Sequence, residues 1–381
     1  LRWWDRWLKG IENGIDQEPM VRLWLQDPAP PAAEYNERPG RWIAEPDWPG
    51  PGLGEKTLGL SETGMLVDGD GDGDIRVRTR LTVGTLTGEW NPHGIGPELP
   101  LDQRSEDACS VLFDTGVLSD DLAIVGFPRL HLRLSSDRPA AMLTARLEMV
   151  TDDGTSTLIT WGCLNLAHRN SHEDPEALVP GEPYDTVLSM NAIAQVVPAG
   201  ARLRLALTTG SWPLLWPSPE IATLALSGEA CRLVLPVRAD QDIDATLVPF
   251  EESEIPEPSA ITWLRPFARS RQFHRDMASR RTELLLDKDD GAYRIEDHGM
   301  EVDQLGAERQ VIVDGNPLSN RGEVSWRIAQ SRGDWNVAVE ATTTVTSDTH
   351  EFHVEARIVA TEGDDTIHDI TMQRSIPRDH L

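Results

Sequence analysis

Two histidines four residues apart are the first candidates for chemistry in this chain. His168 and His172 lie in the segment LAHRNSHE, residues 166–173. On a helix, this spacing would place both imidazoles on one face, where they could bind zinc. The segment follows a predicted strand and precedes an Asp-Pro pair, so we expect a loop, and no third ligand is suitably spaced. A hydrogen-bonded corner between strands is the simpler interpretation. A loop around Arg169 that faces a neighbouring domain is the alternative.

A run of Asp-Gly pairs resembles a calcium-binding loop. Asp68, Asp70 and Asp72 recur at every second residue before Gly73. An EF-hand loop would need a bidentate Glu at its twelfth position, which here is Thr79, and no flanking helix pair is predicted. A solvated turn between strands explains the same composition. The metal site is therefore the weaker interpretation, and we expect no cofactor.

A loop rich in Trp and Pro follows a strongly alternating segment. Leucines alternate with arginines over residues 202–207, which is typical of a strand with one buried face. Residues 211–219 contain Trp212, Trp216 and three prolines, which remove backbone donors and prevent a regular ladder. Two indoles on a stiff loop could form the wall of a binding site or close one end of a sandwich.

The sequence lacks the motifs of several enzyme classes. An α/β-type serine hydrolase needs a G-x-S-x-G elbow to expose its nucleophile, and no such pentapeptide occurs. Gly210-Ser211-Trp212 has no second glycine after the serine. A P-loop, a dinucleotide-binding glycine motif and H-E-x-x-H are also missing. Seven histidines are available as bases, but none has a recognisable nucleophile beside it: His168, His172, His274, His298, His350, His353 and His368.

Composition narrows the classes of partner. The 381 residues are 39% hydrophobic and 26% charged, as in ordinary globular proteins, and could form two or three domains. A net charge of −28 argues against nucleic acid and anionic membranes as partners, and no apolar run is long enough to span a bilayer. Cys109, Cys163 and Cys231 are odd in number and widely spaced. They predict buried thiols in a reducing compartment, and hence a cytoplasmic location.

The N-terminal residues predict a short amphipathic helix. Residues 1–9 place apolar side chains on one face, and Gly10 is a suitable stop. Trp3, Trp4 and Trp7 on such a helix need an apolar partner. They could cap the β-structure that follows or belong to the last helix of a missing domain. We favour the missing domain, because the helix begins at the first residue without an N-cap.

The rest of the chain predicts an all-β protein with two β domains. Turn signals separate candidate strands at the spacing of a β-sandwich, so we expect a jelly roll (galactose-binding-like) over residues 16–247, after a helical segment 1–15. An acidic, Pro-rich linker follows at 248–260, then a smaller antiparallel domain at 261–381. The predicted strands of the two domains are 111–113, 130–134, 142–150, 157–167, 185–194, 202–208, 221–226 and 231–237, then 309–313, 324–328, 335–343 and 352–359.

Several long stretches, rather than one short motif, point to a known family. They are LRWWDRWLKGIENG, EPMVRLWLQ, GRWIAEPDWP, DGTSTLITWGCLNLAHRNSHEDPEALVPGEPY, PAGARLRLALTTGSWPLLWPSPE and LVLPVR. Together they resemble the C-terminal part of the X-Pro dipeptidyl-peptidase and cocaine-esterase family of serine hydrolases, the CocE/NonD type. The resemblance is dense over residues 1–238. Residues 314–319, 332–335 and 375–379 are similar to a C-terminal extension found in a subset of that family.

The resemblance implies that catalysis and the support of the substrate cleft belong to different domains. In that family an α/β-hydrolase domain carries the catalytic Ser, Asp and His, and a jelly roll packs on it and helps wall the substrate cleft. None of the triad residues has a counterpart here, so we assign no catalytic residue. The resemblance implies that the partner is a hydrolase domain missing from this chain. The Trp3, Trp4 and Trp7 helix, the loop 168–173 and the loop 212–220 are the candidate surfaces that meet it.

Three functions are therefore open at this stage. The first is the β part of a serine hydrolase, inactive alone, which stabilises the catalytic domain and shapes its cleft; a homo-oligomer is also open. The second is a free-standing module that binds carbohydrate or another small ligand. Exposed, coplanar rings of Trp212 and Trp216 in a groove would favour it, and buried rings would count against it. The third, a self-sufficient enzyme with an unfamiliar site, is the weakest.

Overall fold

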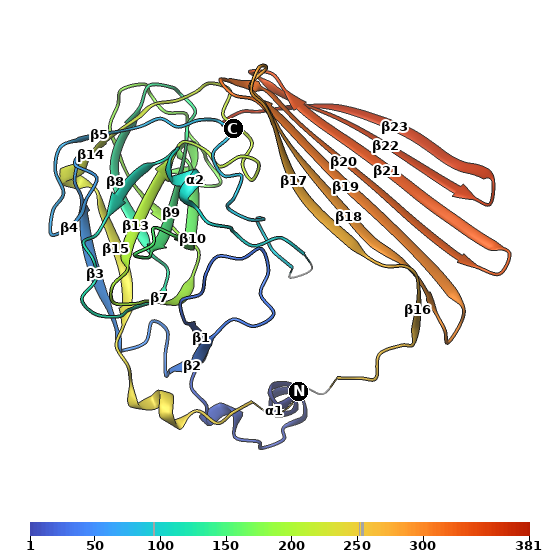
Figure 1. Ribbon diagram of the computed structural model, residues 1–381, viewed down its shortest axis with the longest axis horizontal. Helices are drawn as coiled ribbons and strands as arrows, with labels where there is room; N and C mark the ends of the chain where they lie inside the picture. The colour runs from blue at the N-terminus through green and yellow to red at the C-terminus, as the bar shows by residue number, and fades with distance from the viewer. Residues whose placement is uncertain (94–95, 251, 253–254) are drawn as a thin grey trace.

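Strands dominate the computed structural model of the chain, which describes residues 1–93, 96–250, 252 and 255–381. Figure 1 shows a body of packed strands and a large twisted sheet that projects from one end of it. The described α-helices are two, α1 (Arg2–Lys9) and the single turn α2 (Arg104–Asp107), and four short 3-10 helices accompany them. None of the described helices is long and apolar enough to cross a membrane.

The body contains two sheets that pack face to face. Its larger sheet has eleven strands, mostly antiparallel, with one parallel pairing at Gln26 and Gln195. Its strands are β1 (Val21–Gln26), β2 (Gly40–Glu45), β3 (Leu53–Leu60), β4 (Leu66–Asp68), β5 (Asp74–Val77), β7 (Leu122–Gly126), β8 (Arg129–Ser136), β11 (Tyr184–Ser189), β12 (Ile193–Val197), β14 (Leu224–Ser227) and β15 (Arg232–Arg238).

The smaller sheet of the body has the order β10-β9-β13-β6. On β13, Leu203, Leu205 and Leu207 are fully buried in the core shared with the larger sheet, whereas the arginines between them point away. This alternation places the leucines between the sheets, as the sequence predicts. The strands are β6 (Val111–Asp114), β9 (Met142–Val150), β10 (Ser156–Asn165) and β13 (Arg202–Thr208).

The third sheet, here called the C-terminal sheet, is a long antiparallel meander. Its order is β16-β18-β19-β20-β21-β22-β23, and β17 also pairs with β18. Every residue of the edge strand β23 is exposed. The strands are β16 (Ile261–Arg265), β17 (Ala268–Asp276), β18 (Arg281–Ile295), β19 (Met300–Val313), β20 (Asn316–Arg332), β21 (Trp335–Ser347), β22 (Glu351–Glu362) and β23 (Asp365–Pro377).

Trp212 fastens the C-terminal sheet to the body. Its indole is 1% exposed and packs in one cluster with Leu284, Leu286 and Ile312 of the sheet. The indole Nε1 donates a hydrogen bond to Asn320 Oδ1 at 2.9 Å, so the polar edge of the ring is also satisfied. This contact joins the loop after β13 to β18 and β19 of the sheet.

Trp216 and the C-terminus make a second junction beside the first. The Trp216 Nε1 donates to Ser347 Oγ at 3.0 Å, and its ring meets Phe352 edge-on. Arg378 donates to the Pro217 carbonyl at 2.6 Å and to Ser347 Oγ at 3.0 Å. The Trp- and Pro-rich loop therefore lies between the body and the C-terminal sheet, with Trp212 buried and Trp216 half-buried.

The all-β class is confirmed, whereas the jelly-roll label and the domain limits stay predictions. Strands 142–150 and 202–208 are found at the predicted bounds. The predicted strand 185–194 is wrong, because the chain there forms β11 and β12, which pair with different neighbours. No strand was predicted around Arg41, but this residue lies in β2. Within the predicted linker, Glu251, Ser253 and Glu254 lie outside the described residues.

The expectation that all three cysteines are buried is also wrong. Cys231 is buried, but Cys109 and Cys163 are only partly covered. Cys163 lies on β10, one of the outer strands of the smaller sheet, where cover from neighbours is incomplete. All three are free thiols, and desolvation raises the pKa of the Cys163 and Cys231 thiols.

Replacing Trp212 tests whether this contact holds the sheet to the body. We expect Trp212→Ala to lower the free energy of unfolding by about 3–5 kcal/mol, because it leaves a cavity and an unpaired Asn320. Trp335→Ala is the matched control, since that ring is 41% exposed, and should cost less than about 1 kcal/mol. Urea unfolding measures both, and equal losses would contradict the anchoring role.

Candidate functional site

Arg169 holds the corner that carries the two candidate histidines. Its guanidinium donates to the carbonyls of Leu166 and Glu176, at 3.2 and 2.7 Å. It also lies 4.1 Å from the centre of the Tyr184 ring. These contacts close the loop between β10 and β11, as expected for a hydrogen-bonded corner. Arg169 is therefore occupied with holding the loop itself.

The histidines of this corner lie side by side at the surface. Nδ1 of His168 and Nδ1 of His172 are 3.3 Å apart, and their rings are tilted at 36°. Among the described residues, no third His, Cys, Asp or Glu joins them in a group with ligand spacing. A tetrahedral zinc site needs at least three protein ligands. The pair therefore falls short of a zinc site.

The tryptophan loop does not form an open binding groove. Trp212 is buried, and Trp216 is largely covered by the C-terminal sheet. The cavity beside them measures about 30 Å³, whereas pockets for small ligands measure roughly 300–1,000 Å³. The two rings thus offer no platform on which a sugar could stack.

The N-terminal helix leaves its tryptophans uncovered. Trp3, Trp4 and Trp7 are 56, 58 and 55% exposed, and no residue of α1 is buried. On its polar side, Arg6 pairs with Glu12 at 2.7 Å and approaches Asp16, so the helix is tied to the segment that follows it. Exposed indoles grouped on one short helix are typical of an interaction surface.

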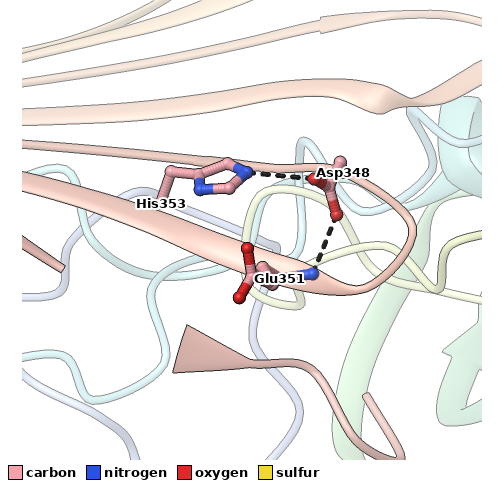
Figure 2. A group of neighbouring side chains, drawn as sticks. All are labelled: Asp348, Glu351 and His353. Atoms are coloured by element: carbon pink, nitrogen blue, oxygen red, sulfur yellow. Dashed lines mark hydrogen bonds and ion pairs between the residues drawn. The ribbon is translucent and has the colours of Figure 1, made fainter. Parts of the chain in front are cut away.

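Only one group among the described residues has the spacing of a metal site. Asp348, Glu351 and His353 bring ligand atoms within 4.8 Å of one another (Figure 2), whereas the three aspartates of the 68–72 run do not. The Asp348 carboxylate already accepts hydrogen bonds from the Glu351 and His350 N–H groups, at 2.8 and 2.7 Å. These bonds hold the pKa of Asp348 at about 2. The group therefore forms the tight turn between β21 and β22.

His353 also contacts a hydroxyl that the sequence did not place beside it. One ring nitrogen lies 3.1 Å from Asp348 Oδ2, and the other lies 3.1 Å from Ser375 Oγ. The expectation that no histidine has a nucleophile beside it is therefore wrong, because β22 and β23 pair His353 directly with Ser375. The side chains of Asp348 and His353 are about half exposed, at 53 and 43%. Water that reaches the trio weakens electrostatic stabilisation of a developing oxyanion.

A buried cluster of charges lies on the outer face of the smaller sheet of the body. Arg146 pairs with Glu148 at 2.8 Å and with Asp107 of α2 at 3.3 Å. Arg204 pairs with Asp107 at 2.9 Å and with Asp114 at 2.7 Å. Three carboxyl groups therefore share two guanidinium groups. Sequence alternation alone did not reveal this cluster, because α2 covers it only in the folded chain.

The cluster has one more carboxyl group than guanidinium groups, and Glu148 is the carboxyl group that favours its protonated form. Burial raises the pKa of Glu148 to about 8, Arg146 opposes the rise and Asp107 adds to it. Ser156 also donates to the Glu148 carboxyl group at 3.1 Å. Because Glu148 is fully buried, a substrate in solvent does not reach this acid.

Comparison with known proteins identifies the family. The family described as the X-Pro dipeptidyl-peptidase C-terminal non-catalytic domain matches residues 13–244, more than half of the chain. The chain belongs to this family. Its matched part contains both sheets of the body and excludes the C-terminal sheet.

Relatives of this non-catalytic domain are hydrolases several times longer than the matched part. The chain is 25% identical to a cocaine esterase of Rhodococcus sp. (strain MB1 Bresler), over 55% of this chain and 37% of that protein. It is 24% identical to a putative Xaa-Pro dipeptidyl-peptidase of Bacillus anthracis, over 55% and 32%. A CocE/NonD family hydrolase from Staphylococcus aureus aligns at 15% identity with a TM-score of 0.46, over 62% and 44%. The chain spans about a third of the length of these curated relatives.

The raised pKa of Glu148 predicts how stability depends on pH. Between about pH 4.5 and pH 8, the folded chain keeps a proton that the unfolded chain has lost, so the free energy of unfolding falls as pH rises. We expect a fall on the order of a few kcal/mol across this window. Glu148→Gln should flatten the profile measured by urea unfolding. An unchanged slope in the variant would contradict this assignment.

Proposed function

We propose that this chain stabilises a catalytic α/β-hydrolase domain and shapes the cleft in which that domain binds its substrate. Membership of a non-catalytic C-terminal family supports the proposal, and so does the lack of a G-x-S-x-G elbow in the sequence. The observation that carries it is the bare tryptophan surface of α1. An apolar surface of this kind is stabilised when another domain covers it.

The other two functions receive less support. Coverage of Trp212 and Trp216 counts against a carbohydrate-binding module at that loop. Within the part of the chain that the structure describes, the hydrogen-bonded trio of Asp348, His353 and Ser375 is the one arrangement that favours a self-sufficient hydrolase. Its exposure on a sheet surface leaves it without the enclosed, preorganised donors that acyl transfer requires.

Turnover by the isolated chain tests its non-catalytic character. We expect no hydrolysis of a p-nitrophenyl ester or of an X-Pro p-nitroanilide above the uncatalysed rate, because the chain carries no activated nucleophile elbow. The control is the Ser375→Ala variant, purified in the same way. Turnover that persists through purification and disappears in this variant would contradict the proposal and assign catalysis to the trio.

Mixing with a hydrolase domain tests the stabilising role. We expect the gene that encodes this chain to encode such a domain, with a G-x-S-x-G elbow followed by an Asp and a His. At about 100 times the dissociation constant, the chain should stabilise that domain by about 2.7 kcal/mol, seen as a higher melting temperature.

Variants of α1 locate the contact in this experiment. Replacing Trp4 and Trp7 together with Glu should abolish most of the stabilisation, since both rings are more than half exposed and available for docking. Trp90→Glu is the control, because Trp90 is similarly exposed but lies elsewhere on the chain. Equal effects of the α1 and Trp90 changes would contradict docking through α1.

A further inference from the structure

The two faces of the C-terminal sheet differ in chemistry. Residues paired directly across antiparallel strands point to the same face, so the register of β20 to β23 defines three rows. Ten of the twelve residues in these rows are apolar, and none is Asp, Glu, Lys or Arg. The rows are Val324-Thr343-Ala356-Met372, Trp326-Ala341-Ile358-Ile370 and Ile328-Val339-Ala360-His368.

The opposite face of the same strands is polar. Of its twelve corresponding residues, only Val359 is apolar, and six carry a charge. Arg357 pairs with Asp369 at 2.7 Å, as expected for a surface in water. The rows on this face are Glu323-Thr344-Glu355-Gln373, Ser325-Thr342-Arg357-Thr371 and Arg327-Glu340-Val359-Asp369. The segregation predicts that the apolar face is covered in the functional protein.

In the isolated chain this apolar face is open. The ten apolar residues of its rows are here called the apolar patch. Ile328, Val339, Ile370 and Met372 within it are between 39 and 44% exposed. At ordinary strand and residue spacings the patch measures about 20 Å on each side, on the order of 400 Å² of contiguous apolar surface. The largest apolar patch on a soluble protein is typically of this size and is often functional.

The Trp326 ring in the patch packs against a glycine of the neighbouring strand. A Cβ added at Gly306 would lie 2.8 Å from the Trp326 ring, so the indole rests directly on the glycine of the neighbouring strand. Trp326 and Gly306 are paired in register across β19 and β20. An aromatic ring that covers a strand glycine stabilises the sheet and flattens the surface that a partner would meet.

The patch lies on the same face of the sheet as the junction with the body. Leu284, Leu286 and Ile312, which enclose Trp212, lie on the same face of the sheet as Trp326. The body therefore already covers part of this face beside β18, and the ion pair between Lys288 and Glu308, at 2.6 Å, lies between that part and the patch. A partner seated on the patch would also adjoin the body.

We infer that the apolar patch of the C-terminal sheet is a second docking surface for the α/β-hydrolase domain, which the body and the sheet would hold between them. This inference rests on the proposed function. The sheet lies outside the matched family region, so the contact would be additional to that of the family domain. The relatives contain about two thirds of a chain that this sequence does not match, and that portion must hold their catalytic part.

Interface size favours a hydrolase domain over a second copy of this chain. Two apolar patches packed on each other would bury about 800 Å² in total, below the roughly 1,200–2,000 Å² of stable interfaces. A domain that contacts the patch together with the body and the exposed tryptophans of α1 would bury more surface than the patch alone provides. The hydrolase domain is therefore the occupant to which the inference commits.

Charge placed on the patch tests the inference. The double variant Val339→Glu and Ile370→Glu introduces two carboxylates at exposed positions of the apolar face, on β21 and β23. We expect it to weaken binding of the separately produced hydrolase domain, measured by isothermal titration calorimetry, at least about tenfold. The matched control is Thr342→Glu with Thr371→Glu, which adds the same charge to the same strands on the polar face. It should change affinity less than about twofold.

The outcomes separate this inference from the proposed function. Binding that is unaffected by the patch variant would overturn the inference and leave the proposed function standing. No binding between the unmodified chain and the hydrolase domain would overturn both. A dimer of the isolated chain that only the patch variant dissociates would make a second copy the occupant and overturn the inference. Circular dichroism and melting temperature confirm that each variant is folded before binding is measured.

Discussion

The burial of one indole ring fixes how the C-terminal sheet is oriented on the body. Trp212 lies in the loop after β13 and packs against Leu284 and Ile312 on one face of the sheet. Its indole N–H donates a hydrogen bond to Asn320. A buried aromatic ring with a paired N–H is both strongly held and directional. It determines which face of the sheet looks toward the body, and the uncovered part of that same face is left to a further partner.

The surfaces that remain bare follow from this constraint. A sheet whose strands alternate apolar and polar residues must cover one face, and the body covers only the end near Trp212. The tryptophans of α1 form a second bare surface, because the polar side of the helix is tied to its own following segment through Arg6. Both surfaces suit a chain whose family is a non-catalytic part of larger hydrolases.

Strand prediction succeeded where alternation was clear and turns were marked, and it failed where either signal was weak. The strand 202–208 was found because leucine recurs at every second position from 203 to 207. The strands of the C-terminal sheet were predicted too short. Gly306 and Gly322 interrupt their apolar pattern, and glycine is unfavourable in strands unless a neighbouring ring covers it. Hydrogen bonding to the neighbouring strands keeps these glycines in the sheet, although glycine itself does not favour a strand.

By itself the sequence determined the all-β class, the family and the lack of a nucleophile elbow, because alternation and long sequence matches are local properties of the chain. Only the tertiary structure decided where the unusual residues lie. Trp212 and Trp216 meet a sheet more than 60 residues further along, and Ser375 comes beside His353 through strand pairing. Such contacts depend on register between distant strands, and a single residue of slip would move each side chain to the opposite face.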